Sequence, residues 1–210
     1  MDTNVHPQIS KSAACHDAYA ADYDSQVHAS GCYIAEVLFG LSFEYLQPGQ
    51  RLLDLGIGSG LSAILFDKAG LQVCGMDFSP AMLELCRAKG FAVELKRHDL
   101  GQSPWPYETE QFDHLVCCGV LHFLVSLENV FREAGRVLRA GGIFAFTTKL
   151  PSSPIDGGRE YEHTLVDGLN IFSHCPDYVK SSIEKYSFEQ LKVLKCFVGQ
   201  DAFYAWIVQK

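Results

Sequence analysis

The densest group of chemically informative residues is an aspartate followed by three alternating glycines: Asp54, Gly56, Gly58 and Gly60. Glycines in this spacing let the chain turn sharply and let a ligand lie against bare backbone. The helix expected to begin near Gly60 presents free N–H groups and the positive end of its dipole to the same place. The pattern therefore predicts a ligand-binding turn between a strand and a helix.

The spacing of the glycines separates two ligand classes, dinucleotides and amine-bearing nucleosides. The dinucleotide fingerprint is G-x-G-x-x-G. Counted from Gly56, its third position is Leu61, and counted from Gly58 it is Ala63. A carboxylate at Asp54 would repel a pyrophosphate and attract an ammonium group. The pattern therefore favours an amine-bearing ligand such as S-adenosylmethionine.

Two further aspartates follow the next two predicted strands. Asp77 comes 21 residues after Gly56, where a Rossmann-like sheet places the acid that accepts hydrogen bonds from ribose hydroxyls. Asp99 follows the third strand. Since the carboxyl ends of parallel strands meet at one crevice, we expect Asp54, Asp77 and Asp99 to converge there. The alternative for any one of them is an ordinary turn or cap residue.

Strands and helices alternate around these residues. The predicted strands span 51–55, 71–76, 91–96, 112–118 and 143–148. The predicted helices between them span 61–69, 80–90 and 127–138, and residues 98–111 and 139–142 are predicted as a loop and a turn. This alternation indicates a parallel sheet built from βαβ units.

The two ends of the chain add elements of other kinds. Two helices are expected before the first strand, over 13–23 and 33–46. After the last of these strands we expect an irregular segment over 151–167 and a helix over 177–186. An antiparallel hairpin is expected over 191–198 and 202–208. The chain is thus predicted as a single α/β domain spanning 1–210, with residues 1–48 as an N-terminal helical cap. Its Rossmann-like, seven-stranded sheet is mostly parallel, with the last strand antiparallel and helices on both faces.

Composition limits the partners. The 17 basic and 25 acidic residues give a net charge of −8, which disfavours nucleic-acid binding because phosphate contacts need clustered Lys and Arg. No apolar run reaches the length of a membrane helix, and no export signal precedes the domain. The eight cysteines show neither C-x-x-C nor paired histidine spacing. We therefore expect a cytoplasmic protein with no metal site, no nucleic-acid partner and no membrane partner.

A chain of motifs in order resembles the class I S-adenosylmethionine-dependent methyltransferases, in their small-molecule-type (type 11/25-like) branch. The motifs are Asp54–Gly60, Asp77–Met82, His98–Leu100, Phe112–His122 and Arg136–Gly142, preceded by Tyr19–Asp24. The resemblance covers residues 19–148 well and the tail loosely. It implies S-adenosylmethionine as the cofactor and S-adenosylhomocysteine as the product.

The resemblance assigns the methionine and ribose ends of this cofactor. The backbone of Gly56, Ile57 and Gly58 would hold the methionine moiety, and Asp77 the ribose. The N-terminal segment with Tyr19 and Tyr23 would close over the methionine end.

The adenine end and the sulfonium are assigned in the same way. Phe78 and Met82 would pack on adenine, although both could be ordinary core residues, and Asp99 with Leu100 would read its edge. Cys118 or Gly119 would line the sulfonium, and His122 would lie at the end of the same block, facing the acceptor side. Cys118 could instead be a plain strand residue, and His122 could act as a general base or pack on the cofactor.

The methyl acceptor is not identified by any motif. The fourth strand is followed by Cys117–Val120 instead of the Asn- or Asp-Pro-Pro-Tyr of amino-methylating relatives, which lowers the case for base methylation. Residues 150–176 are predicted to be an insertion that caps the acceptor pocket. The candidate acceptor contacts in it are Tyr161, His163, Phe172 and His174, each of which could instead merely pack or face water.

The predicted function is in-line methyl transfer to an unidentified small molecule, with no catalytic residue assigned. Alternatives are a non-catalytic S-adenosylmethionine-binding subunit or regulator, a protein methyltransferase, and an NAD-dependent oxidoreductase that would share the sheet and its acidic residue.

Overall fold

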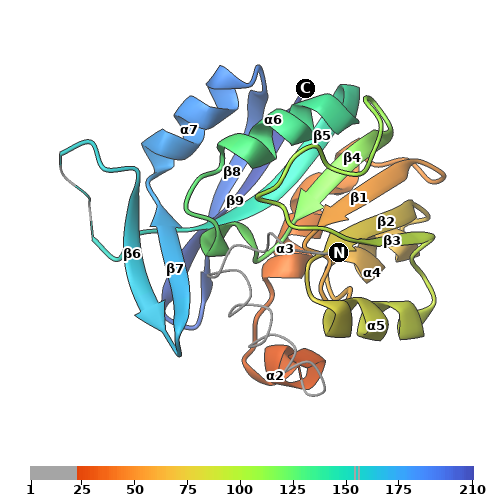
Figure 1. Ribbon diagram of the computed structural model, residues 1–210, viewed down its shortest axis with the longest axis horizontal. Helices are drawn as coiled ribbons and strands as arrows, with labels where there is room; N and C mark the ends of the chain where they lie inside the picture. Colours follow the sequence, from red (N-terminus) through yellow and green to blue (C-terminus); the bar gives the residue numbers. More distant parts are fainter. Residues whose placement is uncertain (1–22, 154, 156) are drawn as a thin grey trace, which may run out of the picture.

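The computed structural model describes residues 23–153, 155 and 157–210. Its centre is a seven-stranded sheet in the order β3-β2-β1-β4-β5-β9-β8 (Figure 1). The strands are β1 (Arg51–Leu55), β2 (Gln72–Asp77), β3 (Glu94–Arg97), β4 (Phe112–Cys117), β5 (Leu138–Lys149), β8 (Glu189–Val198) and β9 (Asp201–Gln209). Strands β1 to β5 pair in parallel, and β9 runs antiparallel to both β5 and β8. The predicted fold class, including the antiparallel last strand, is confirmed.

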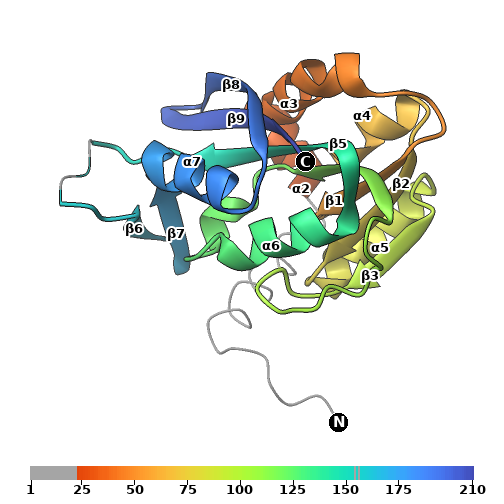
Figure 2. The same cartoon turned by 90° about the horizontal axis from the view of Figure 1, so that it is seen from above.

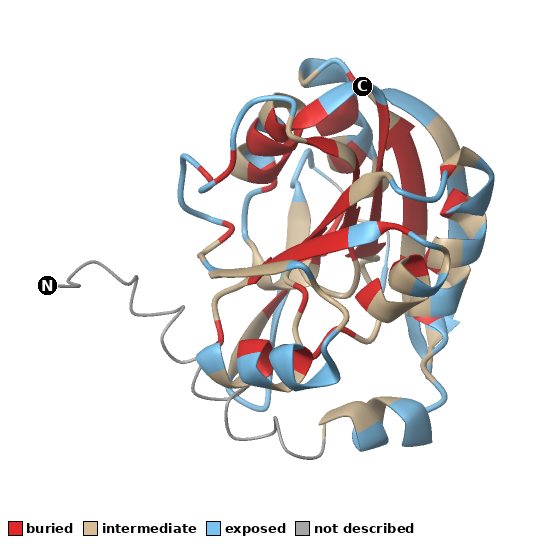
Figure 3. Ribbon diagram, turned by 90° about the vertical axis from the view of Figure 1, so that its right-hand side faces the viewer, coloured by how far each residue is buried: buried red, intermediate tan, exposed pale blue. Residues whose placement is uncertain are grey.

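Helices cover both faces of this sheet (Figure 2). One face carries α3 (Ile34–Ser42), α4 (Ala63–Lys68) and α5 (Pro80–Lys89), and the other carries α6 (Glu128–Val137) and α7 (Pro176–Lys185). Successive strand residues point to opposite faces, so that Leu52 packs under the first layer while Leu53 and Leu55 pack under the second. Figure 3 shows the result, with buried residues concentrated in the central strands and on the inner sides of the helices.

Local signals placed α5 correctly. The Ser79 hydroxyl accepts a hydrogen bond from the Met82 N–H at 3.1 Å, and Pro80 occupies the first helical position. The helix ends at Gly90, whose φ of 71° lies in the left-handed region that favours glycine.

The connection from β3 to β4 contains no helix, as predicted. Its apolar side chains take the place that a helix would fill, because Trp105 and Tyr107 are buried in the core of the α6 face. The Trp105 N–H donates to Glu133 of α6 at 2.8 Å, and the Tyr107 hydroxyl donates to the Gly75 carbonyl at 3.2 Å.

Three predictions of local structure were wrong in part, and a fourth lies almost entirely outside the described residues. Residues 139–142 form a bulge inside β5 instead of a turn before it, because the Gly141 N–H and the Gly142 carbonyl bond to the backbone of Lys210, directly after β9. The third strand begins at Glu94 rather than at 91. The helix expected over 33–46 is divided into α3 and the 3-10 turn η2 (Phe43–Tyr45). The helix expected over 13–23 lies outside the described residues except for Tyr23, which begins α2 (Tyr23–Ala29).

Part of the segment predicted as irregular, 151–167, forms one strand of a separate two-stranded sheet, whose other strand follows that segment. Strands β6 (Tyr161–Val166) and β7 (Leu169–His174) pair antiparallel around Asp167 and Gly168, both in the left-handed region. This hairpin stands beside the main sheet and reaches down from α7 along one side of the molecule (Figure 1). Its strand β7 packs against the 3-10 turn η3 (Leu121–Phe123).

Candidate functional site

The turn between β1 and α4 forms the base of the candidate site. Gly56, Gly58 and Gly60 have φ values of 76°, 55° and 88°, which only glycine adopts without strain. A Cβ at Gly56 would lie 2.6 Å from the Val120 side chain, and one at Gly60 would lie 2.6 Å from the Phe91 ring. At Gly58 the nearest atom would be 4.0 Å away. Gly56 and Gly60 are therefore required by packing, whereas the open space over Gly58 is available to a ligand.

Asp54, one residue before the end of β1, carries an unusual carboxylate. Its side chain is fully buried, one oxygen accepts from the Ser62 hydroxyl at 2.9 Å, and the other has no hydrogen-bond partner in the described structure. Burial, opposed by the Ser62 hydrogen bond and reinforced by the charge of Asp77, raises the pKa of Asp54 to about 7. A buried carboxylate with a spare acceptor is a site for a cation or an ammonium group.

The side chain of Asp77, the last residue of β2, is hydrogen-bonded to the glycine turn that follows β1. Its Oδ2 accepts from the Gly58 N–H at 2.9 Å, and its Oδ1 accepts from the Ser79 N–H at 2.8 Å. Asp54 and Asp77 therefore lie near each other at the carboxyl ends of β1 and β2, where the charge of Asp77 acts on Asp54.

The residues predicted for the adenine end lie beyond β2 and β3. Phe78 is half-buried and Met82 is almost fully buried in α5. One oxygen of Asp99 accepts from the Gly101 N–H at 2.8 Å, and the other is buried with no hydrogen-bond partner in the described residues. Leu100 belongs to the core of the α6 face, and its carbonyl accepts from Asn129 at 2.7 Å. Asp99 thus offers a polar atom to a ligand, whereas the side chain of Leu100 packs in the core.

The residues predicted near the sulfonium follow β4. The thiol of Cys118 has its pKa raised by burial and by the charge of Asp54. The Gly119 N–H donates to the Thr147 hydroxyl at 2.8 Å. His122 in η3 lies against two aromatic rings, with centroid distances of 4.2 Å to Phe123 and 6.0 Å to Phe203.

One predicted residue, Ile57, faces away from this crevice. Its side chain is buried over Gly75, where any Cβ would come within 2.4 Å of it. Only the backbone of Ile57 can therefore face a ligand.

The short helix α2 contacts the glycine turn. Burial, followed by the nearby thiols of Cys118 and Cys32, raises the pKa of Tyr23 to about 12. Asp24 accepts from the Ser59 hydroxyl and pairs with Lys89, at 2.5 Å in each case. The predicted contact residue Tyr19 lies outside the described residues.

Sequence reasoning missed the residues that fasten α2 to the glycine turn. Asp24, Ser59 and Lys89 are far apart in the sequence, and no single motif contains all three. Ser59 lies inside the glycine motif, so its hydroxyl was the one signal that could have indicated a partner.

The residues predicted to contact an acceptor share one face of the β6–β7 hairpin. Tyr161 and Phe172 meet edge to face at 5.3 Å, and His163 stacks on Phe172 at 4.9 Å while bonding to Asn170. His174 differs from the others because it is fully buried, stacks on Tyr178 at 5.8 Å, and has its pKa lowered to about 4 by burial. His174 is thus enclosed within the body of the protein, and His163 is exposed.

The known proteins that are similar to this chain are described as methyltransferases or as methyltransferase-like. A family described as "Methyltransferase domain" matches residues 53–146. The malonyl-[acyl-carrier protein] O-methyltransferase of Legionella pneumophila is 32% identical over 180 residues, which cover 83% of this chain and 60% of that protein. Human methyltransferase-like protein 27 is 32% identical over 164 residues, which cover 76% of this chain and 66% of that protein. The chain therefore spans about three-fifths to two-thirds of the length of these relatives.

A solved structure extends the similarity to the whole chain. The 1,6-didemethyltoxoflavin-N1-methyltransferase of Burkholderia thailandensis, with bound 1,6-didemethyltoxoflavin and S-adenosylhomocysteine, has a TM-score of 0.73 at 14% identity. The match covers 100% of this chain and 93% of that one. At this identity the similarity concerns the fold.

Proposed function

Because this chain belongs to the class I S-adenosylmethionine-dependent methyltransferases of the type 11 branch, we propose that it transfers a methyl group from S-adenosylmethionine to a small-molecule acceptor. The observation that carries the proposal is the spare oxygen of Asp54. This buried carboxylate lies at the end of β1, directly before the open glycine turn. It fits the ammonium group of the cofactor's methionine moiety and not a pyrophosphate.

Each residue of the crevice has a role in this proposal. The carboxylate of Asp54 accepts hydrogen bonds from the ammonium group, and that of Asp77 accepts them from the ribose hydroxyls. The spare oxygen of Asp99 accepts from the adenine amine. Gly58 keeps the turn free of side-chain atoms, and Tyr23 covers the opening on the side of α2.

The methyl transfer itself requires little of the protein beyond alignment. The bound cofactor supplies a methyl group on a positively charged sulfur, which is already a good leaving group. The protein holds the acceptor in line with that bond and excludes water, which can lower the barrier by ~7–11 kcal/mol. The side chains suited to this task line the end of β4 and η3, where His122 packs between Phe123 and Phe203.

The net charge of the chain supports a small, uncharged or cationic acceptor. With 25 acidic and 17 basic residues, the protein repels polyanions. The β6–β7 hairpin lies next to η3 and supplies aromatic side chains beside this region, which suits a small organic molecule.

Labelled methyl transfer tests the proposal directly. The protein is incubated with methyl-labelled S-adenosylmethionine and a metabolite extract, and the label is followed into small molecules, protein and RNA. We expect label in a small molecule with the unmodified protein.

Asp77→Ala should bind S-adenosylhomocysteine at least tenfold more weakly, because it loses charge-assisted hydrogen bonds worth ~1.5–3 kcal/mol each, while retaining its circular dichroism spectrum.

The control is Asp177→Ala, which removes an exposed aspartate on α7. Its product formation and affinity should equal those of the unmodified protein. Label in RNA or protein would contradict the small-molecule acceptor. Binding of S-adenosylhomocysteine without transfer to any fraction would contradict catalysis and favour a non-catalytic binding subunit.

A further inference from the structure

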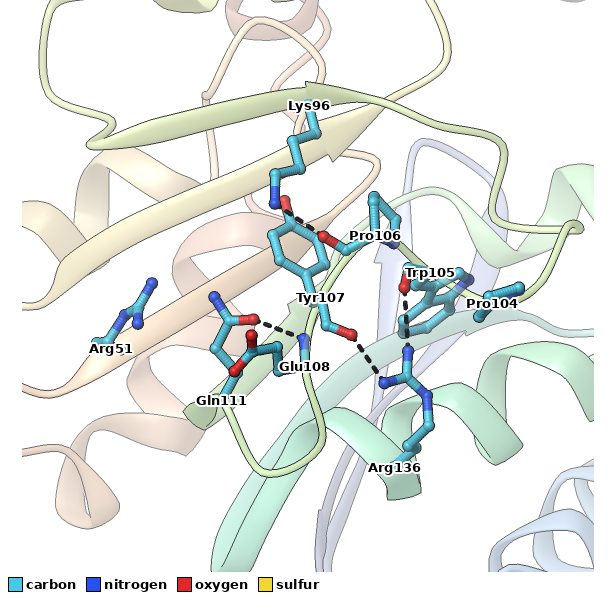
Figure 4. Close-up of a pocket in the computed structure, with 9 residues that line it drawn as sticks. All are labelled: Arg51, Lys96, Pro104, Trp105, Pro106, Tyr107, Glu108, Gln111 and Arg136. Atoms are coloured by element: carbon cyan, nitrogen blue, oxygen red, sulfur yellow. Dashed lines mark hydrogen bonds between the residues drawn. The ribbon is translucent and has the colours of Figure 1, made fainter.

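A second hollow lies away from the cofactor crevice, on the α6 face of the sheet. It has a volume of about 590 Å³, and its wall includes Arg51, the first residue of β1, and Gln111, directly before β4 (Figure 4). Arg51 and Gln111 therefore mark the amino ends of β1 and β4, whereas Asp54 and Asp77 lie toward the carboxyl ends of β1 and β2. The hollow is bordered by the β3–β4 connection, where no helix covers the sheet. A hollow of this size holds a small organic molecule.

Three cations line this hollow, and two of them are already engaged. Arg136 pairs with Glu133 at 2.6 Å and donates to the carbonyls of Trp105 and Tyr107. Lys96 pairs with Glu94 at 3.1 Å and donates to the Pro106 carbonyl at 2.8 Å. These two side chains hold the β3–β4 connection in place while adding positive charge to the wall.

Arg51 retains its hydrogen-bonding capacity. In the described part of the chain its guanidinium makes no ion pair, and it meets only the Cys74 sulfur at 3.7 Å and the Phe112 ring at 5.3 Å. Gln111 stands beside it in Figure 4, with its amide oxygen accepting from the Glu108 N–H at 2.7 Å. This bond leaves the amide N–H groups of Gln111 available as donors.

We infer that this hollow binds a small organic anion whose phosphate or carboxylate group is held by Arg51 and the amide of Gln111. A guanidinium presents paired donors that match such oxyanions. Lys96 and Arg136, which also line the hollow, add favourable charge. Among the described residues, Glu108 is the one carboxylate that lines the hollow, and it acts against the bound anion. The inference is independent of the methyl-transfer function proposed above, since it involves none of the cofactor-site residues.

Calorimetric titration with two probes, pyrophosphate and citrate, tests this inference and separates phosphate from carboxylate chemistry. We expect at least one probe to bind the unmodified protein. Arg51→Gln should weaken that binding by about tenfold or more, because one charged hydrogen-bonding partner is lost. Glu108→Gln should strengthen it several-fold, because the opposing charge is removed. The hydrogen bond between the Arg51 backbone and Asp113 persists in Arg51→Gln.

Arg87→Gln is the matched control, because it removes the same charge from an exposed position on α5. It should leave the affinity unchanged. Absence of binding to both the unmodified protein and Glu108→Gln would overturn the inference. So would an equal loss in Arg51→Gln and Arg87→Gln, which would indicate non-specific attraction. If Arg51→Gln fails to fold, the gain expected in Glu108→Gln still decides the question.

Discussion

At the scale of single residues, the buried carboxylate of Asp54 has the clearest consequences. Its pKa of about 7 lies above the ordinary value of 3.8 because burial disfavours the charged form. Between these two values the folded chain binds more protons than the unfolded chain. The free energy of unfolding of the ligand-free protein therefore falls as the pH rises through this window.

Replacing this carboxylate should remove that pH dependence. As the pH rises from about 5 to 8, we expect the free energy of unfolding of Asp54→Asn to fall less than that of the unmodified protein, because the amide does not ionise. Urea denaturation without ligand measures this difference across the range. Equal slopes for the two proteins would contradict the raised pKa.

The same carboxylate makes ligand affinity depend on pH when the ligand carries an ammonium group. S-adenosylhomocysteine has this group and 5′-methylthioadenosine lacks it. Affinity for the first should rise relative to the second as the pH increases toward about 8, because ionised Asp54 attracts the ammonium. Parallel affinity curves for the two ligands would exclude a contact between Asp54 and the ammonium.

At the scale of elements, the Asp24 side chain attaches α2 to the glycine turn and to α5. Asp24 bonds to both Ser59 and Lys89. We expect Asp24→Ala to release S-adenosylhomocysteine several-fold faster, because α2 covers the crevice and loses its polar attachment. Stopped-flow displacement measures the rate. The melting temperature of the ligand-free protein should change little, because Lys89 and Asp24 are partly exposed.

Asp177→Ala, on the far helix α7, is again the matched control for this experiment. Its dissociation rate should equal that of the unmodified protein. A normal rate in Asp24→Ala would mean that α2 does not retain the ligand.

Trp105 is one of the two large side chains that fill the place of a helix under the β3–β4 connection. Trp105 is 1% exposed and belongs to the core of the α6 face. Trp105→Ala should lower the free energy of unfolding by ~3–5 kcal/mol, as for other large core residues. Urea denaturation measures this loss. A loss below ~1 kcal/mol would show that the connection closes over the space without the indole.

At the scale of the whole molecule, the two core layers share one sheet, so ligand binding at its carboxyl edge should stabilise the domain as a unit. S-adenosylhomocysteine at a hundredfold excess over its Kd should add ~2.7 kcal/mol to the free energy of unfolding. For a domain of this size, this corresponds to a rise of ~5–10 °C in melting temperature. Differential scanning calorimetry measures the shift.

NADH is the discriminating ligand in the same experiment. It should leave the melting temperature unchanged, because the glycine turn lacks the dinucleotide spacing and Asp54 repels a pyrophosphate. A larger shift with NADH than with S-adenosylhomocysteine would contradict the cofactor assignment. No described helix is long and apolar enough to cross a bilayer.

The sequence by itself determined the architecture and the location of the crevice. Short-range signals were sufficient for this purpose. The Ser79 cap and Gly90 bounded α5, apolar runs identified the parallel strands, and the DLGIGSG motif specified left-handed backbone at three glycines. Each signal depends on residues within a few positions of one another, and the parallel sheet then brings the strand ends together.

Only the tertiary structure decided which groups remain available at that crevice and which are used by the fold. Burial turned Asp54 into a carboxylate with a raised pKa, and packing turned Ile57 inward over Gly75. The attachment of α2 and the pairing of β6 with β7 depend on residues with no local signature. Whether Arg51 is left without an ion pair likewise follows from the positions of carboxylates on other elements. Contacts of this kind join residues far apart in the chain, and their energies depend on burial that no sequence pattern specifies.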